Sequence, residues 1–281
     1  MKTMMDYYSR AKFFRTKKRL GQNFLINGEV IQDIIDYAKI SKEDVIVEIG
    51  PGVGFVTEQL VKYAKKVIAI ELDEEAIKEL EKLDCDNLKI IHNDILKTDL
   101  SELCEENIKI IANIPYYITS PIIAHLLGEI DDLENKNRNK IIDIVLMVQE
   151  EVARRIVATE KSSGKQYGLL TILSQFWADC EIIRTVGRKS FYPAPKVNSA
   201  LVSLKVRKEP KLKLSDYSFF RKTIKAAFSQ RRKTLKNCLV SNGFDKNKVS
   251  EAIKELNFNE NIRGEKLSIE DFGKLSELLS N

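Results

Sequence analysis

The chain has 281 residues, of which 43% are hydrophobic and 31% charged, and its formal net charge is +5. This is ordinary globular composition, which excludes a disordered, fibrous or low-complexity protein, and the length allows one or two folding units. No apolar run in the sequence approaches the roughly 20 residues that a transmembrane helix needs.

Charge, cysteine and histidine content narrow the class of protein further. The N-terminal residues are basic and have no apolar stretch of the kind found in a secretory signal, so a cytoplasmic location is expected. The four cysteines are far apart in the sequence, and only two histidines, His92 and His125, are present. We therefore expect no zinc site, no disulfide framework and chemistry that needs no metal.

The positive charge is concentrated at the two ends of the chain. Residues 1–22 carry a net charge of +6 and residues 207–281 a net charge of +7, which leaves −8 for residues 23–206. Lys and Arg gathered in this way are typical of proteins that bind polyanions such as nucleic acids, because they neutralise phosphates. A lysine-rich surface that contacts only solvent is the alternative interpretation.

From residue 41 the sequence predicts strands that alternate with helices. Short runs of Val and Ile are typical of parallel strands that are covered on both faces, so the pattern favours an α/β fold with a Rossmann-like sheet. The predicted strands lie at 45–50, 67–72, 88–94, 108–116 and 140–148, and the predicted helices at 55–64, 74–83, 120–127, 149–158 and 169–178, with a loop at 164–168.

The last third of the chain changes in character. Strands are expected at 181–186 and 200–206, on either side of an extended turn at 191–197 whose two prolines prevent regular pairing. Beyond them only helices are predicted, at 217–240, 246–256 and 269–279, with caps at Asp245 and Ser268 and a stop at Gly243. The predicted division is a basic N-terminal extension at 1–22, a Rossmann-like domain at 23–208 and a helical domain at 209–281.

Polar residues follow the first three predicted strands, at the edge where an open parallel sheet binds ligands. The first strand ends in the glycine-rich segment EIGPGVG (48–54), but Phe55 stands where the dinucleotide fingerprint needs Gly or Ala. Glu71 ends the second strand and could accept the ribose hydroxyls of a nucleoside, and Asp94 follows the third and could accept from an adenine amine. Together they favour S-adenosylmethionine over a dinucleotide, although each alone is typical of a tight turn or a solvated strand end.

The fourth strand runs into Asn113, Ile114, Pro115 and Tyr116. An exocyclic amine is a poor nucleophile because its lone pair is delocalised into the ring. The Asn113 side-chain oxygen and a backbone carbonyl at Ile114 or Pro115 could accept both of its N–H bonds and draw the nitrogen toward tetrahedral geometry. Pro115 would fix that backbone, and Tyr116 would stack on a flipped-out base. A proline-stiffened strand exit with a core aromatic is the alternative.

The turn at 191–197 adds two candidate contacts to nucleic acid. Phe191 could form the second side of an aromatic clamp on the base, and a role in core packing is an equal alternative. Lys196 could meet a phosphate.

These motifs resemble those of a known family, the KsgA-type small-subunit rRNA adenine dimethyltransferases. The similarity covers about residues 21–240 and rests on GQNFLIN (21–27), EIGPGVG (48–54), ELD (71–73), NIPYYITSP (113–121), FYPAPKVNSALV (191–202) and QRRKTL (230–235). It implies a Rossmann-like methyltransferase domain followed by a small helical domain. Cofactor contacts carried over from the family fall on Asn23, Leu25, Gly50, Glu71, Asp94 and Asn113.

The resemblance also implies a reaction and a partner. Methyl groups pass from S-adenosylmethionine to N6 of two adjacent adenines in a hairpin loop near the 3′ end of 16S rRNA, on an immature small ribosomal subunit, and S-adenosylhomocysteine is the product. We expect a monomer that does not bind membranes. Tyr117 stands where the family often has Asn, and the leading extension is longer than usual, so its role is open.

A second RNA contact is predicted on the helix at 217–240. On a continuous helix Arg221, Lys225, Arg232 and Lys236 fall within about 60° of arc, beside an apolar face, because each residue advances about 100°. A row of one sign next to a packing face favours contact with phosphates, whereas a solvated face is the commoner meaning of such a row.

Three other functions compete with small-subunit rRNA methylation. Erm-type large-subunit rRNA methyltransferases share the Asn-Ile-Pro-Tyr motif, but EIGPG and QRRKTL favour the small-subunit group. A ribosome-assembly checkpoint factor with weak catalysis is possible, although Glu71, Asp94, Asn113 and Tyr116 are all present. Methylation of DNA adenine would predict a doubled proline after the Asn or Asp, which is absent from the sequence.

Overall fold

The computed structural model describes residues 4–162 and 166–280, and the chain divides into two compact units. The first unit runs to Gly128 and also includes Glu134–Ala153 and Asp179–Val206. The second unit includes Glu129–Leu133, Arg154–Ala178 and the chain from Arg207 onward. Its last stretch thus begins next to the domain boundary predicted at residue 208, but two earlier segments join it. The loop predicted at 164–168 lies partly outside the described residues.

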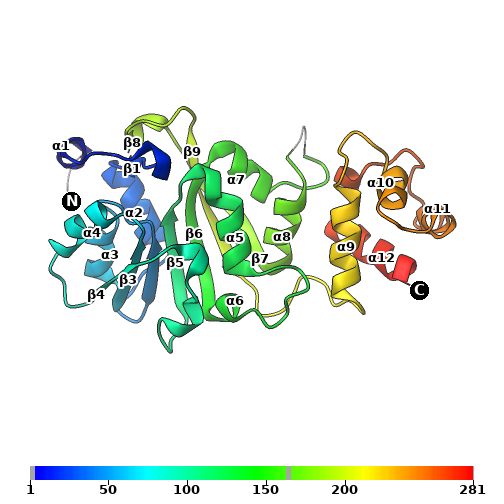
Figure 1. Cartoon of the computed structure of the whole chain (residues 1–281), viewed down its shortest axis with the longest axis horizontal. Helices are drawn as coiled ribbons and strands as arrows, with labels where there is room; N and C mark the ends of the chain where they lie inside the picture. The colour runs from blue at the N-terminus through cyan, green and yellow to red at the C-terminus, as the bar shows by residue number, and fades with distance from the viewer. Residues whose placement is uncertain (1–3, 163–165, 281) are drawn as a thin grey trace. The chain divides into compact units, whose positions relative to one another are not determined.

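The first unit is built on a mixed sheet (Figure 1). The strands lie in the order β4 (Leu88–His92), β3 (Lys66–Glu71), β2 (Val45–Ile49), β5 (Ile108–Asn113), β6 (Ile141–Gln149), β9 (Ser199–Val206) and β7 (Ala178–Val186). The five strands from β4 to β6 pair in parallel, and β9 pairs with β6 in the antiparallel sense. The order reverses between β2 and β5, which is where sheets of this kind bind ligands.

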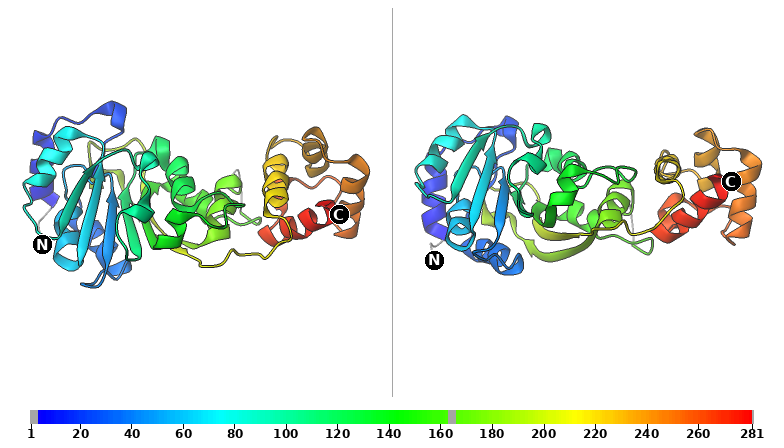
Figure 2. Two further views of the ribbon diagram at one scale, coloured as in Figure 1. Left: turned by 60° about the horizontal axis from the view of Figure 1, so that its bottom comes forward. Right: turned by 90° about the horizontal axis from the view of Figure 1, so that it is seen from below.

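Helices cover both faces of this sheet (Figures 1 and 2). The core on one face joins Ile34 of α2 (Gly28–Tyr37) and Leu60 of α3 (Thr57–Tyr63) to alternate strand residues such as Ile46 and Val67. α5 (Thr119–Leu127) buries its apolar side chains on the opposite face. Other helices of this unit and its borders include α4 (Glu74–Glu81), α6 (Lys136–Lys140) and α7 (Glu150–Ile156).

The N-terminal extension is part of the first unit and not a separate region. Residues Met4–Phe13 form helix α1, which buries Tyr7 and Ala11. The Tyr7 ring lies 4.9 Å from the ring of Phe55, and its hydroxyl accepts a hydrogen bond from Gln59 at 3.1 Å. The extension therefore packs on the start of α3 through Tyr7. The basic charge of this segment gave no indication of such a packing role.

A second small sheet ties the N-terminal region to the proline-containing turn. Strand β1 (Phe24–Leu25) pairs in the antiparallel sense with β8 (Phe191–Tyr192), so that Leu25 lies opposite Phe191. Both of these side chains are buried in the hydrophobic core, where they are 2% and 3% exposed. Regular pairing thus reaches two residues into the segment in which the sequence predicted none.

The second unit is helical. It contains α8 (Leu169–Trp177), α9 (Tyr217–Ala227), α10 (Leu235–Ser241), α11 (Lys246–Glu255) and α12 (Ile269–Ser280). Phe176 of α8 contacts the rings of Tyr217 and Phe220 on α9, which explains why α8 groups with the C-terminal helices. Asp245 caps α11 and Gly243 has a positive φ of 87°, as expected from the sequence.

The single helix predicted at 217–240 is wrong. α9 ends at Ala227, a turn follows, and Thr234 caps α10 by accepting a hydrogen bond from the Asn237 N–H group. The Ser229 hydroxyl donates to the carbonyl of Ala226 at 2.7 Å, which supports the turn at a site with neither Gly nor Pro. Arg221 and Lys225 therefore lie on one helix, Arg232 in the turn and Lys236 on another helix, and the predicted common arc does not exist.

Short 3-10 helices lie at Lys18–Leu20, Ile95–Lys97, Leu100–Glu102, Tyr116–Ile118, Arg188–Ser190 and Gly264–Lys266.

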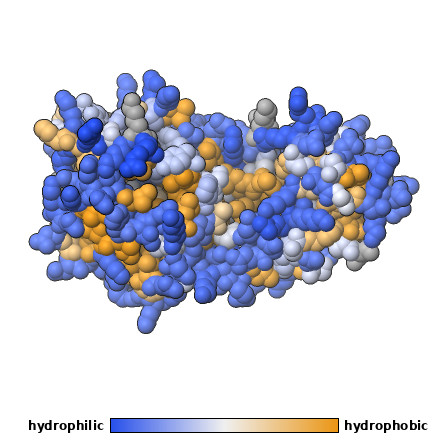
Figure 3. Space-filling model, in the orientation of Figure 1, coloured by the Kyte–Doolittle hydropathy of each residue, from blue (hydrophilic) through white to orange (hydrophobic). Residues whose placement is uncertain are grey.

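Hydrophilic residues cover most of the face drawn in Figure 3, and hydrophobic ones gather over the region of β3 and β4. There the edge strand β4 buries its apolar side chains only in part. Within the described part of the chain, no helix combines the length and the apolar character needed to cross a bilayer.

Candidate active site

A cavity of about 810 Å³, partly open to solvent, lies at the carboxyl ends of β2, β3, β4 and β5. Its wall includes Gly50 and Gly52 after β2, Glu71 at the end of β3 and Asp94 after β4. The segment at 113–118 closes it on the β5 side, and residues 20–24 contribute from the N-terminal region. The predicted cofactor and target-base motifs therefore meet in one cavity within the first unit.

The glycine-rich turn presents bare backbone to this cavity. Gly50 has a φ of +65°, and a Cβ atom added there would meet nothing within 4 Å, so the space beside it is open. Gly52 has a φ of +57°, and a Cβ there would lie 2.7 Å from the ring of Phe24. The first glycine thus leaves room for a ligand, whereas the second is required by the close packing of Phe24.

Glu71 is held by backbone donors. Its Oε2 accepts the Gly52 N–H at 2.9 Å, and its Oε1 accepts the N–H groups of Leu72 and Asp73, both at 2.9 Å. Burial raises the pKa of Glu71 above its usual value, and these three hydrogen bonds act in the opposite direction. Because two carboxylate oxygens offer about four acceptor sites, one remains for a ligand hydroxyl.

Asp94 also lines the cavity, whereas Glu48 is buried at the end of β2 and does not line it. Asp94 Oδ1 caps the 3-10 helix at Ile95–Lys97 by accepting the Leu96 N–H at 3.0 Å. Glu48 lies beneath the glycine-rich turn, and burial raises its pKa to about 8, against the lowering effect of Thr57. Its Oε2 has no hydrogen-bond partner among the described residues. Glu48 had no predicted role, although an acid directly after a buried Val-Ile-Val run is a signal that could have drawn attention to it.

The Asn113 side chain is oriented by a backbone carbonyl. Its Nδ2 donates to the carbonyl oxygen of Asn23 at 2.8 Å, which directs Oδ1 away from that contact as a free acceptor. The Pro115 carbonyl already accepts the Ile118 N–H at 3.1 Å. Of the two backbone acceptors that the sequence left open, the Ile114 carbonyl is therefore the better one.

Two tyrosines line the cavity next to this asparagine. The Tyr116 hydroxyl shares a hydrogen bond of 2.6 Å with Ser199 Oγ, and burial raises its pKa. This contact fixes the ring. Tyr117 also lines the cavity, yet 63% of it is exposed. One fixed ring and one exposed ring at the cavity mouth suit the stacking of unpaired bases.

Some predicted site residues lie elsewhere. Leu25 and Phe191 do not line this cavity, and the clamp role predicted for Phe191 is wrong because its side chain packs in the core opposite Leu25. Lys196 is exposed on its loop. Asn23, Gly50, Glu71, Asp94 and Asn113 all line the cavity.

The basic residues of the second unit differ in what they contact. Arg221 pairs with Glu129 at 2.8 Å and with Asp131 at 3.3 Å, and Lys225 lies 3.9 Å from Glu129. These acids already neutralise the α9 end of the predicted row. Arg232 is exposed and Lys236 is half-buried.

The groups that line the cavity fit S-adenosylmethionine. A carboxylate with spare acceptor capacity at the end of β3, a second one after β4 and an open glycine backbone match a ribose, an adenine amine and an amino-acid tail. In the described ranges 4–162 and 166–280, no group of three or more His, Cys, Asp or Glu residues is arranged to hold a metal ion.

Comparisons with known proteins agree with this geometry. The model of the ribosomal RNA adenine dimethylase family matches residues 13–281. A relative from Clostridium botulinum (strain Langeland), called ribosomal RNA small subunit methyltransferase A, is 43% identical over 270 residues, which cover 95% of this chain and 94% of the relative. A relative of the same name from Bacillus licheniformis is 41% identical over 278 residues, which cover 95% of this chain and 92% of the relative.

Two solved structures are similar over most of the chain. A dimethyladenosine transferase from Plasmodium falciparum aligns with a TM-score of 0.72 and 30% identity, over 89% of this chain and 94% of that one. The 23S rRNA methyltransferase ErmE aligns with a TM-score of 0.71 and 26% identity, over 92% of this chain and 100% of that one.

Proposed function

Because this chain belongs to the ribosomal RNA adenine dimethylase family, we propose that it methylates N6 of two adjacent adenines in the 3′-terminal hairpin loop of 16S rRNA. The observation that carries the proposal is that Glu71, Asp94 and Asn113 line one and the same cavity. We further propose that the substrate is the immature small subunit and that the enzyme acts as a cytoplasmic monomer.

Bound S-adenosylmethionine would supply an electrophilic methyl group on a sulfonium centre. Glu71 would accept a ribose hydroxyl, Asp94 the adenine amine, and the open backbone at Gly50 would leave room for the amino-acid tail. The family also suggests cofactor contacts at Asn23 and Leu25, and the buried side chain of Leu25 restricts its contribution to backbone.

The chain's own groups prepare the target nitrogen. Asn113 Oδ1 and the Ile114 carbonyl would accept the two N–H bonds of N6, so that the nitrogen becomes tetrahedral and its lone pair, no longer delocalised into the ring, faces the methyl carbon. The new N–C bond forms as the C–S bond breaks, S-adenosylhomocysteine remains, and the acidic proton on N6 is lost to solvent. Preorganised acceptors of this kind act mainly by electrostatic stabilisation of the transition state. Tyr116, fixed through Ser199, would hold the flipped base by stacking.

RNA phosphates would be bound by exposed cations. The exposed Arg232 and Lys196 and the half-buried Lys236 are proposed as such contacts. Arg221 and Lys225 are weaker candidates, because contact with phosphate competes with their acidic neighbours. Their role would follow only if those ion pairs open.

The test is to incubate the protein with labelled S-adenosylmethionine and with ribosomal subunits that lack these methyl groups, and to map the modified nucleotides. We expect two adjacent dimethylated adenines in small-subunit rRNA and a much slower incorporation of label with Asn113→Ala. Label in large-subunit rRNA would favour the Erm-type alternative, which the similarity to ErmE makes worth measuring. Tight binding to immature subunits without turnover would favour the checkpoint alternative.

A further inference from the structure

Residues 17–24, here called the N-terminal arm, connect the side of the cavity formed by β2, β3 and β4 with the side formed by the end of β5. The arm meets the loop after β3 through Lys17 and Gln22, and it meets the end of β5 through Asn23. Leu20 to Phe24 line the cavity between these points. Any ligand that fills the cavity therefore contacts the arm.

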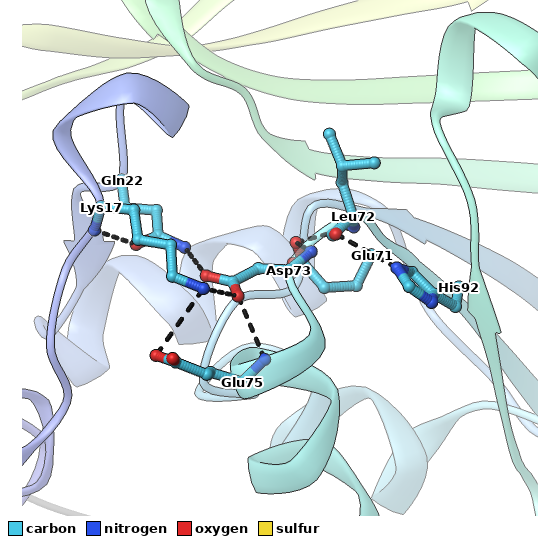
Figure 4. Close-up of polar contacts among 7 residues, drawn as sticks. All are labelled: Lys17, Gln22, Glu71, Leu72, Asp73, Glu75 and His92. Carbon is cyan, nitrogen blue, oxygen red and sulfur yellow. Dashed lines mark hydrogen bonds and ion pairs between the residues drawn. The ribbon is translucent and has the colours of Figure 1, made fainter.

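Asp73 holds the first end of the arm (Figure 4). Its Oδ1 accepts Lys17 Nζ at 2.6 Å and its Oδ2 accepts Gln22 Nε2 at 2.7 Å, while the Lys17 N–H donates to Gln22 Oε1 at 2.7 Å. The Asp73 side chain is fully buried and that of Lys17 is 27% exposed. Burial tends to raise the pKa of Asp73, but the hydrogen bonds from Lys17 and Gln22 lower it below its usual value. The carboxylate is therefore ionised and paired at neutral pH.

The same aspartate is joined to the proposed ribose acceptor. The Asp73 N–H donates to Glu71 Oε1 at 2.9 Å, and its side chain also caps α4 by accepting the Glu75 N–H at 3.1 Å. Figure 4 shows Glu71 and the arm residues on either side of Asp73. A shift of the arm that moves Asp73 would consequently also displace the Glu71 carboxylate.

The other end of the arm packs on the target-base segment. Gly21 has a φ of +61°, and a Cβ added there would lie 3.2 Å from the Tyr117 ring and 3.3 Å from Pro115. Two residues later the Asn23 carbonyl holds the Asn113 amide. The arm thus sets the orientation of the group that is proposed to accept the target amine.

We propose that Lys17 and Gln22 are positioning residues, which through Asp73 hold the N-terminal arm over the bound methyl donor. This inference rests on the proposed function. It assigns Lys17, a member of the basic N-terminal extension, to a contact inside the protein and not to RNA phosphate. Loss of the contact frees the arm at its β3 end, so the donor is less well enclosed and Asn113 less well oriented.

The experiment compares full-length variants without RNA. Lys17→Met and Gln22→Ala remove the two side-chain donors, Lys17→Arg keeps a cation, and Arg19→Met removes the same charge from an exposed position in the arm. Isothermal titration with S-adenosylhomocysteine measures Kd, and hydrogen exchange followed by mass spectrometry reports on peptides from residues 17–24. The Tm of each variant shows whether the fold is intact.

We expect Lys17→Met and Gln22→Ala each to raise Kd by about 10-fold, because each removes one hydrogen bond to the Asp73 carboxylate. Exchange in the arm should accelerate while exchange in β2 and β3 stays as in the wild type. Lys17→Arg should recover most of the affinity, and Arg19→Met should behave as the wild type.

Unchanged affinity in Lys17→Met, or an equal loss in Arg19→Met, would overturn the inference, as would a lower Tm with unchanged arm exchange. A wild type that does not bind S-adenosylhomocysteine at all would overturn the proposed function and this inference with it. Methyl groups mapped to another RNA would overturn only the proposed substrate, because these measurements contain no RNA.

Discussion

The two halves of the cavity use opposite kinds of chemistry. On the side of β2, β3 and β4 the groups are acids, and backbone N–H groups hold Glu71 and Asp94 in place. On the side of β5 the groups are neutral, and Asn113 and Tyr116 are held through Asn23 and Ser199. The acidic half suits recognition of hydroxyls and amines in the ground state, whereas the neutral half suits a nitrogen that becomes positive during reaction.

This difference teaches where binding and catalysis should separate. A change in the acidic half should act mainly on the affinity for the donor, and a change in the neutral half mainly on turnover, since only interactions that strengthen in the transition state raise kcat. Five experiments test this separation and the surroundings of the two halves.

The largest effect is expected for Asn113→Ala. Loss of a preorganised acceptor typically costs about 2.7–4 kcal/mol, so kcat should fall about 100-fold to 1000-fold. Binding of rRNA should stay nearly intact. The Kd for S-adenosylhomocysteine should stay within about 5-fold of the wild-type value, a smaller change than the loss of a hydrogen bond to a charged group would cause. Single-turnover methylation and titration of the two ligands provide the measurement. Turnover close to that of the wild type would remove Asn113 from the mechanism.

Two substitutions at Tyr116 distinguish the role of its ring from that of its hydroxyl. Tyr116→Ala should lower kcat/KM for RNA by about 10-fold to 100-fold, because stacking on a base contributes about 1–3 kcal/mol. Tyr116→Phe keeps the ring and loses only the hydrogen bond to Ser199, so we expect a change of less than about 5-fold. If the two variants lose activity equally, the hydroxyl and not the ring is what matters.

Outside the cavity, reversal of charge at Arg232 and Lys236 should weaken RNA binding and reduce its salt dependence by about one unit of slope per lost phosphate contact. The matched control reverses Lys248 and Lys254, two exposed lysines of α11. Binding of rRNA fragments measured at several salt concentrations distinguishes them. Equal slopes in both double variants would mean that Arg232 and Lys236 do not contact phosphate.

Asp94→Asn tests the acidic half with little structural cost. The Asn oxygen can still accept the Leu96 N–H, so the cap remains, but the ligand loses a charged acceptor. We expect Kd for S-adenosylhomocysteine to rise about 5-fold to 10-fold, in keeping with about 1 kcal/mol per hydrogen bond, with kcat at saturating donor nearly unchanged. Asp99→Asn, which alters an equivalent cap at Leu100–Glu102, is the control. A fall in kcat larger than the change in Kd would contradict the separation of the two halves.

Glu48→Gln should have the smallest effect on activity, and it should change the pH dependence of stability instead. Burial raises the pKa of the folded carboxyl to about 8, so unfolding releases its proton once the pH exceeds the usual range of a glutamate. The wild type should therefore lose stability as the pH rises toward 8, and Glu48→Gln should lack this loss. Melting curves of both proteins should coincide near pH 4.5, the unshifted value, and diverge by pH 8 in favour of the variant. Parallel curves over this range would show that Glu48 is ionised in the folded protein.

The sequence predicted the acidic half best, because strand ends are local features. Continuous Val and Ile runs located β2 and β3, and the acids that follow them share one edge of the sheet by topology alone. The neutral half was located as well, but the partners that orient it were not. Asn23 lies 90 residues from Asn113, and Ser199 lies 83 residues from Tyr116.

Errors arose where contacts distant in sequence decide the structure. Phe191 was open to either a clamp or a core role, and the pairing with Leu25 in a strand of two residues decides for the core. The amphipathic pattern continues across residues 228–234, yet side-chain hydrogen bonds at Ser229 and Thr234 end one helix and start another. Lys17 and Asp73 are 56 residues apart, so the basic extension resembled a simple charged tail.

The central claim is that the donor lies against the ends of β2, β3 and β4 with its methyl group facing Asn113. A crystal structure with S-adenosylhomocysteine tests it most directly. We predict a ribose hydroxyl within hydrogen-bond distance of Glu71, the adenine amine at Asp94, and Asn113 Oδ1 pointing toward the space beyond the sulfur. A ligand bound elsewhere, or an Asn113 amide whose oxygen faces Asn23, would contradict the account.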